Sequence, residues 1–446
     1  MKNASAWLIE LFRTRETYTL QRQSVWKENR WLILASFICL ILVIVARSWP
    51  NYVTPGLYVE DNSHYFNHFY GSTRGLQDIL HTPNGYHNIL NNLLAFLIAK
   101  MDVRLQPAVY LGLATVFAVM AVMILPCTGL LRNKYILFIA PFLLGLSGLN
   151  HIFYYITLTY QIYVFVILLI CLLFWEPLKT NRANILLFAL LSLLVWSGPY
   201  SVLVAPFSLC FILFFRGKTA FLTALTVVVV LYTLSVSNNM ILLRNLWKPA
   251  IHEVWLGTLV AKVFMMGLGG AFTVKKLMLC LGFFLGLLAI FRRDSFYLKI
   301  ACLLLVLINS SLAALFLSKK YMISLRVLPC YLVIAQFFWL FFLLFTADRL
   351  LALRKGLYHG GLVVALLAVL FIYRDDTLHP YKWSFPTMPK LAEFLQLVHD
   401  SEQLDLAGQH KGRILQFGHK SFRPVVRVGK TDDPNAAVEQ IVMEEQ

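Results

Sequence analysis

The stretch that decides the fold is residues 31–47, WLILASFICLILVIVAR, which carries no charge before Arg47. Its length approaches the ~20 apolar residues that a helix needs to cross a hydrocarbon layer of about 30 Å. The apolar residues run continuously instead of alternating, which favours a helix over a barrel strand. A helix also satisfies its own backbone hydrogen bonds in lipid, so the stretch predicts a transmembrane helix.

Similar apolar runs recur along the 446 residues, of which 59% are hydrophobic and only 14% are charged. No soluble core of this size would require so many. We therefore predict an all-α polytopic membrane protein with about eleven transmembrane helices. The expected spans are residues 31–47, 107–125, 135–149, 161–175, 184–198, 199–215, 219–236, 277–291, 298–317, 328–346 and 357–373.

The net charge of +17 comes from short basic clusters between these runs. Membrane orientation and lipid phosphates explain such clusters better than nucleic acid does, so we expect membrane lipids and no nucleic acid as partners. The positive-inside rule places the basic segment 1–30 in the cytoplasm. The first loop, residues 48–105, is then extracytoplasmic, and residues 31–373 form the membrane domain.

Residues 374–446 form a small polar C-terminal tail on the outer side. We expect an amphipathic helix at 389–398 and two strands, at 413–417 and 425–428, packed as a cap on the outer face. The seven cysteines lie in or beside apolar spans without CxxC spacing, which indicates neither a disulfide framework nor a thiolate metal site.

Two adjacent carboxylates, Glu60 and Asp61, stand in the first outer loop of a chain that has few carboxylates to place. One of them could act as a general base toward an acceptor hydroxyl. A solvated acidic pair at a helix N-terminus is the structural alternative. Glu60, His64 and His68 also occur at fourfold spacing, so a divalent metal is possible, although water-facing side chains or sugar contacts explain them better.

Further along the same loop, a turn at residues 82–86 precedes a two-faced helical pattern over 86–99. We expect an interfacial helix there, with Tyr86 and His87 at the mouth of a cavity, and a second such element at 256–274. The alternative is that one of these segments spans the membrane and reverses the sides downstream. Other candidate substrate contacts in outer loops are His64, Tyr155, Tyr160, Gln161 and Tyr200.

Several cations fall on the outer side against the charge rule, among them Lys319, Lys320 and Arg326. An enzyme that uses a lipid phosphate would need cations on this side. Arg326 is the best single candidate for a phosphate contact, because its planar guanidinium can bind bidentately.

These features occur in an order that resembles bacterial C-type-fold (GT-C) membrane glycosyltransferases, and most closely the glucosyltransferases that modify O-antigen. They are the acidic pair, the P-x-G-Y turn at 83–86, the polar loop at 151–161, the S-G-P-Y turn at 197–200 and the R-x-x-P segment at 326–329. The resemblance covers roughly residues 31–373.

The resemblance implies transfer of a sugar from a polyprenyl-phosphate-linked donor to an envelope glycan or a lipid-linked acceptor, at the periplasmic face of the inner membrane. Asp61 or Glu60 would be the catalytic base, with Asp61 slightly favoured. Arg326, with Lys319 or Lys320, would bind the donor phosphate, and no cofactor is firmly implied. The alternatives are a flippase or transporter of a lipid-linked sugar, and a polymerase or ligase of the O-antigen type.

Overall fold

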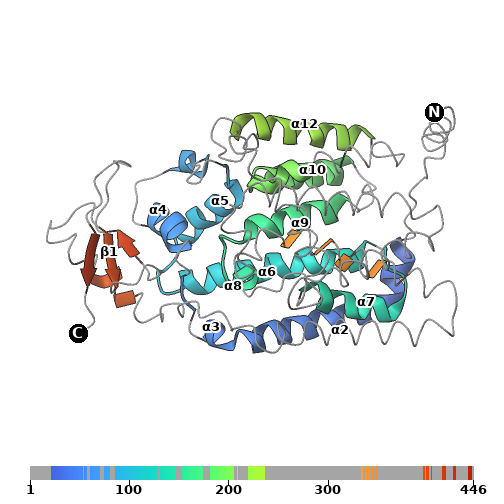
Figure 1. Cartoon of the computed structure of the whole chain (residues 1–446), viewed down its shortest axis with the longest axis horizontal. Helices are drawn as coiled ribbons and strands as arrows, with labels where there is room; N and C mark the ends of the chain where they lie inside the picture. The colour runs from blue at the N-terminus through green and yellow to red at the C-terminus, as the bar shows by residue number, and fades with distance from the viewer. Residues whose placement is uncertain are drawn as a thin grey trace, which may run out of the picture.

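The computed structural model describes residues 22–236 with several gaps, single residues within 333–348 and 395–403, and three short strands between 414 and 443. The part between 22 and 236 is helical (Figure 1). The predicted spans at 277–291, 298–317 and 357–373, the segment 256–274, and the cations Lys319, Lys320 and Arg326 lie outside the described residues.

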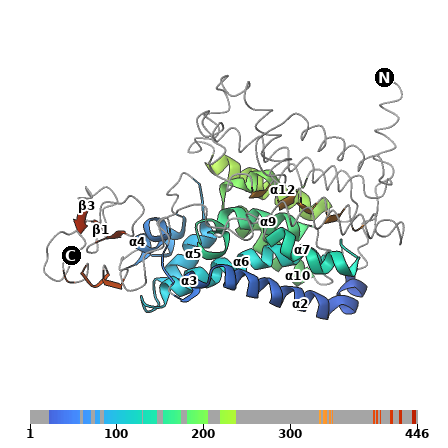
Figure 2. The same cartoon turned by 60° about the horizontal axis from the view of Figure 1, so that its bottom comes forward.

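Two described helices are long and apolar enough to cross a membrane, α2 (Arg22–Arg47) and α6 (Gln106–Cys127). They contain the predicted spans 31–47 and 107–125. The 22 residues of α6 extend about 33 Å, close to the thickness of a hydrocarbon layer. Helix α2 lies along an edge of the bundle in both views (Figure 2), and exposes apolar side chains at helical spacing: Trp31, Leu34, Ile38 and Leu42. An exposed apolar stripe of this kind suits contact with lipid.

Four further apolar helices begin and end near predicted spans. They are α7 (Lys134–Leu143), α9 (Gln161–Leu173), α10 (Asn181–Val195) and α12 (Thr219–Val236). All residues of α9 are buried, as expected for a helix that is hydrophobic all round and lies inside the bundle. Of the predicted span at 199–215, the structure describes the short 3₁₀ helix η4 (Pro199–Leu203) and single residues after it.

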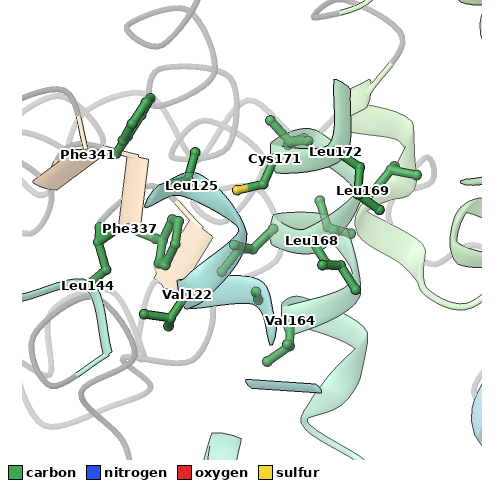
Figure 3. Packing of buried hydrophobic residues seen from close by; sticks show 14 of the residues in the cluster. Val122, Leu125, Leu144, Val164, Leu168, Leu169, Cys171, Leu172, Phe337 and Phe341 are labelled. Carbon is green, nitrogen blue, oxygen red and sulfur yellow. The ribbon is translucent and has the colours of Figure 1, made fainter. Parts of the chain in front are cut away.

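The core lies where α6 and α9 pack against each other, with Val122 and Leu125 of one helix and Val164 and Leu168 of the other (Figure 3). Phe337, from the far end of the sequence, joins the same core. Two hydrogen bonds tie helices together across this core. The Ser36 hydroxyl of α2 donates to the Phe138 carbonyl of α7 at 2.9 Å. The Thr115 hydroxyl of α6 donates to the Tyr155 carbonyl of α8 (Phe153–Ile156) at 2.8 Å.

One end of the bundle, here called the basic end, holds the start of α2, the end of α6 and the start of α7, with Arg30, Arg132 and Lys134. Asn133 caps α7 by accepting hydrogen bonds from the amides of Tyr135 and Ile136. The buried Asp348 carboxylate accepts two more, from the amides of Arg132 at 2.9 Å and Asn133 at 2.7 Å. The predicted cytoplasmic location of this end stays a prediction.

The opposite end, here called the loop end, holds the first loop. Its elements are α3 (Trp49–Val53), the π-helical η1 (Asp61–Phe66), α4 (Asn67–Phe69), the 3₁₀ helix η2 (Leu76–Leu80) and α5 (Ile89–Ile98). Helix α5 has 10 residues, or about 15 Å, which is too short to span. Its Asn91 and Asn92 are buried while Leu97 is exposed. Ala95 and Ile98 are buried as well, so α5 packs its polar face and part of its apolar face into the protein, and its interfacial position stays a prediction.

The C-terminal tail forms a three-stranded sheet of order β2-β1-β3, with β1 (Ile414–Phe417) antiparallel to β2 (Val425–Arg427) and parallel to β3 (Gln440–Met443). Strand β2 lies beside η1 and α4 at the loop end (Figure 1). Val398, within the predicted tail helix, is buried in a small core with Tyr65, Phe66 and Phe69 of the first loop. The tail thus packs on the loop that carries the acidic pair.

Candidate functional site

Asp61 is buried at the loop end and joins two loops that are far apart in the sequence. Its carboxylate accepts hydrogen bonds from the backbone amides of Leu158 at 3.0 Å and Thr159 at 2.7 Å, and from the Thr159 hydroxyl at 2.6 Å. Hydrogen bonds to a charged acceptor are among the stronger ones in proteins. Both carboxylate oxygens are therefore engaged in holding the 157–161 loop against η1.

In the same element as Asp61, the Tyr65 hydroxyl binds two side-chain amides from the start of α5. It accepts hydrogen bonds from the side chains of Asn88 at 2.6 Å and Asn91 at 3.2 Å. The same Asn91 amide donates to the Leu158 carbonyl at 2.9 Å, next to the amides bound by Asp61. Burial raises the pKa of Tyr65 well above its ordinary value, and Tyr86 and Asp61 raise it further, so the phenol stays protonated at neutral pH.

Three aromatic rings meet where the first loop touches the ends of α10 and α12. The His87 ring lies 5.1 Å from the Trp196 ring and 6.4 Å from the Tyr232 ring, and the rings of Trp196 and Tyr232 are 5.6 Å apart. Tyr86 is partly buried and packs against the core cluster that contains Tyr232.

Backbone hydrogen bonds fix the start of α5 on the same turn. The Ile89 amide donates to the Trp196 carbonyl at 3.1 Å, and the Leu90 amide donates to the Ser197 hydroxyl at 3.0 Å. The first amides of a helix have no partner within the helix and need one outside it. The S-G-P-Y turn supplies these partners, so its position determines where α5 presents its polar face.

We call the combined group the loop-end cluster; its members are Asp61, Tyr65, Tyr86, His87, Asn88, Asn91, Trp196 and Tyr232. Within the described part of the chain, four of its buried polar atoms have no hydrogen-bond partner: Nδ1 of His87, Oδ1 of Asn88 and of Asn91, and the Tyr232 hydroxyl. Native proteins pair nearly all such atoms. The cluster therefore has unused capacity to hydrogen-bond a hydroxyl-rich ligand or water, beside aromatic faces on which a sugar ring could stack.

Of the predicted substrate contacts, the structure places His87 against the rings of Trp196 and Tyr232 and packs Tyr86 on the core cluster that contains Tyr232. It uses four others as packing or loop contacts. The Tyr155 hydroxyl donates to the Gly145 carbonyl at 2.6 Å, and the Gln161 side-chain amide donates to the Thr157 carbonyl at 3.0 Å. Tyr160 and Tyr200 both make ring contacts with Tyr163. These contacts position the 157–161 loop and the S-G-P-Y turn.

Three predicted roles fall on residues whose structure is not described. Glu60 and the cations Lys319, Lys320 and Arg326 lie outside the described residues, and for His64 only the backbone, within η1, is described. In the part of the chain that is described, no three His, Cys, Asp or Glu side chains are arranged to hold a metal ion. Because Lys319, Lys320 and Arg326 are not described, the predicted phosphate contacts stay predictions.

The sequence argument did not assign a role to Tyr65, Asn91 or Tyr232. Asn91 carried a usable signal, because asparagines at 88, 91 and 92 form one polar face of an otherwise apolar helix. A polar face that is buried must find partners, and here it finds Tyr65 and main-chain carbonyls. Tyr232 carried no such signal, since a tyrosine near the end of a span is ordinary.

Comparison of the chain with protein-family models, with curated proteins and with solved structures finds no match in any of the three.

Proposed function

We propose that this chain is a membrane glycosyltransferase of the GT-C type, which transfers a sugar from a polyprenyl-phosphate-linked donor to an envelope glycan or lipid-linked acceptor. The proposal places the reaction at the loop end, on the periplasmic face of a bacterial inner membrane that the chain crosses about eleven times. The observation that supports it best is the loop-end cluster. A carboxylate, unpartnered hydrogen-bonding atoms and three aromatic rings gather there, at one end of an apolar bundle.

This combination suits a carbohydrate better than an ion or an apolar ligand. A sugar offers hydroxyl groups to the acceptor oxygens of Asn88 and Asn91, and a flat face of C–H groups to the partly exposed Trp196. The ends of α10 and α12 contact the cluster, so a lipid-linked donor could keep its chain in the membrane while its sugar enters. The described cluster contains no lysine or arginine, so the donor phosphate requires the cations predicted at Arg326, Lys319 and Lys320.

In the proposed reaction, a carboxylate of the acidic pair takes the proton from the acceptor hydroxyl while that oxygen forms a bond to the anomeric carbon. The bond between that carbon and the phosphate oxygen breaks, and the lipid phosphate leaves with the electron pair. Its developing charge needs cations nearby. Because Asp61 already accepts three hydrogen bonds, we propose Glu60 as the proton acceptor and Asp61 as the residue that positions the loop.

The test is a transfer assay with the full chain in lipid nanodiscs, radiolabelled polyprenyl-phosphate glucose as donor and lipopolysaccharide as acceptor. We expect labelled glycan from the wild type and none from Glu60→Gln. The exposed Asp102→Asn is the matched control, because Asp102 is also at the loop end and its carboxylate accepts a hydrogen bond from the nearby Arg104 amide. Full activity in Glu60→Gln would move the base to Asp61, and activity that survives both Glu60→Gln and Asp61→Asn would exclude the acidic base.

The same protein in sealed vesicles separates transfer from transport. A flippase would move the labelled donor to the other leaflet without forming a labelled glycan. That result would refute the proposed activity while leaving a sugar-binding role for the loop-end cluster.

A further inference from the structure

A half-open groove lies between α2 and α6 at the basic end, far along the bundle from the loop-end cluster. Its volume is about 400 Å³, within the ~300–1,000 Å³ typical of small-molecule sites. Trp31, Leu34 and Phe37 line it from α2, and Met123 and Cys127 line it from α6. The two helices that form it are the two described helices that are able to span a membrane.

The groove is apolar along its length and has one cation, Arg30, which lies at the start of the apolar part of α2. The Arg30 guanidinium lies 5.4 Å from the centre of the Trp31 ring, which orients it at this end of the groove. Within the described part of the chain, no carboxylate pairs with Arg30. An arginine and a tryptophan beside an apolar groove match the headgroup and acyl chain of a lipid.

We propose that this groove binds one acidic phospholipid of the leaflet at the basic end, with the phosphate on Arg30 and an acyl chain against Leu34, Phe37 and Met123. Three observations favour an anionic lipid over a neutral one. Among the described residues that line the groove, the only charged one, Arg30, is positive. Arg132 and Lys134 lie at the same end of the bundle, and the chain as a whole has a net charge of +17. A basic residue near the membrane surface raises the affinity for anionic lipids roughly fivefold.

The native Cys127 offers a direct test, because it lines the groove and is only partly buried. The other cysteines are replaced by serine, Cys127 is labelled with bimane, and the full chain is placed in phosphatidylcholine nanodiscs. A brominated phosphatidylglycerol or a brominated phosphatidylcholine is then added at equal fractions. We expect the acidic lipid to quench the label at a roughly fivefold lower fraction than the neutral one.

Three variants identify the parts of the site. Arg30→Gln removes the preference for the acidic lipid, whereas Arg104→Gln, which removes an arginine at the loop end, leaves it unchanged. Met123→Trp fills the groove and lowers quenching by both lipids. Native mass spectrometry of the unlabelled chain measures retained phosphatidylglycerol and does not depend on the cysteine replacements.

Equal quenching by the two lipids in the wild type, or an unchanged preference in Arg30→Gln, would overturn the proposal. So would displacement of phosphatidylglycerol by an equal amount of polyprenyl phosphate, because the occupant would then be the isoprenoid lipid. None of these readings depends on glycosyl transfer, so the lipid site and the proposed activity can fail separately.

Discussion

Asp61→Asn should destabilise the fold as well as alter any chemistry at the loop end. The substitution keeps the shape of the side chain but replaces one oxygen with an NH₂ group. If the remaining oxygen keeps the two hydrogen bonds from Thr159, the NH₂ group faces the Leu158 amide across 3.0 Å, donor against donor. Asp61→Asn thus loses one charged hydrogen bond and leaves the buried Leu158 amide without an acceptor. Together these should lower the free energy of unfolding by about 2–4 kcal/mol.

The assay is unfolding of the purified chain in mixed detergent micelles by increasing fractions of sodium dodecyl sulfate, followed by circular dichroism. Thr159→Val is the partner substitution, since it removes only the hydroxyl hydrogen bond and should cost about 1–2 kcal/mol. The double variant should lose less than the sum of the two single losses, because Asp61→Asn removes the charge of the acceptor and so already weakens the hydrogen bond that Thr159→Val deletes. Unfolding of Asp61→Asn at the wild-type detergent fraction would refute the assigned hydrogen bonds.

Three further predictions concern packing and protonation. Burial raises the pKa of Tyr65, so the protonated phenol stabilises the fold fully below about pH 10, and this stabilisation is lost as the pH rises toward the folded-state pKa. Unfolding midpoints measured from pH 8 to 11 should therefore fall more steeply for wild type than for Tyr65→Phe. Parallel curves for the two proteins would contradict this. Gly198→Ala should lower the unfolding temperature by the equivalent of about 1–3 kcal/mol, because the new Cβ would lie 3.1 Å from the Ile162 carbonyl oxygen; Gly75→Ala, with open space around it, is the matched control. Asn133→Ala should cost about 1 kcal/mol in the detergent titration through loss of the α7 cap, whereas Asn133→Asp should retain most of it.

The helices of the described region follow from patterns that are local in the sequence. Helix α6 extends the predicted span by one residue at its start and two at its end, since hydropathy marks the apolar centre of a helix better than its ends. The short α5 was predictable because its two faces differ so sharply in polarity. The strands at 414–417 and 425–427 lie within one residue of the segments expected from their β-branched residues, whereas β3 was not predicted.

The contacts of the candidate site could not be predicted in the same way. Asp61 meets Thr159 across 98 positions of the chain, and His87 meets Tyr232 across a still longer separation. Periodicity determines which side of a helix is polar, but it does not determine which other helix end will lie opposite. The acidic pair was therefore recognisable as a candidate site, while the proposed partition of roles within it rests on hydrogen bonds of Asp61 that only the structure shows.

That partition decides how mutations of the pair must be interpreted. Asp61 joins η1 to the 157–161 loop by hydrogen bonds. Tyr65, also in η1, accepts hydrogen bonds from Asn88 and Asn91 at the start of α5. A variant of Asp61 would release this junction, so its activity would fall whether or not its carboxylate accepts the proton. Glu60→Gln changes the neighbouring carboxylate and leaves in place the donors and the acceptor of the three hydrogen bonds described for Asp61. Only a stable Glu60→Gln protein that has lost transfer activity identifies the base, and an inactive, destabilised Asp61→Asn identifies a residue that holds the site together.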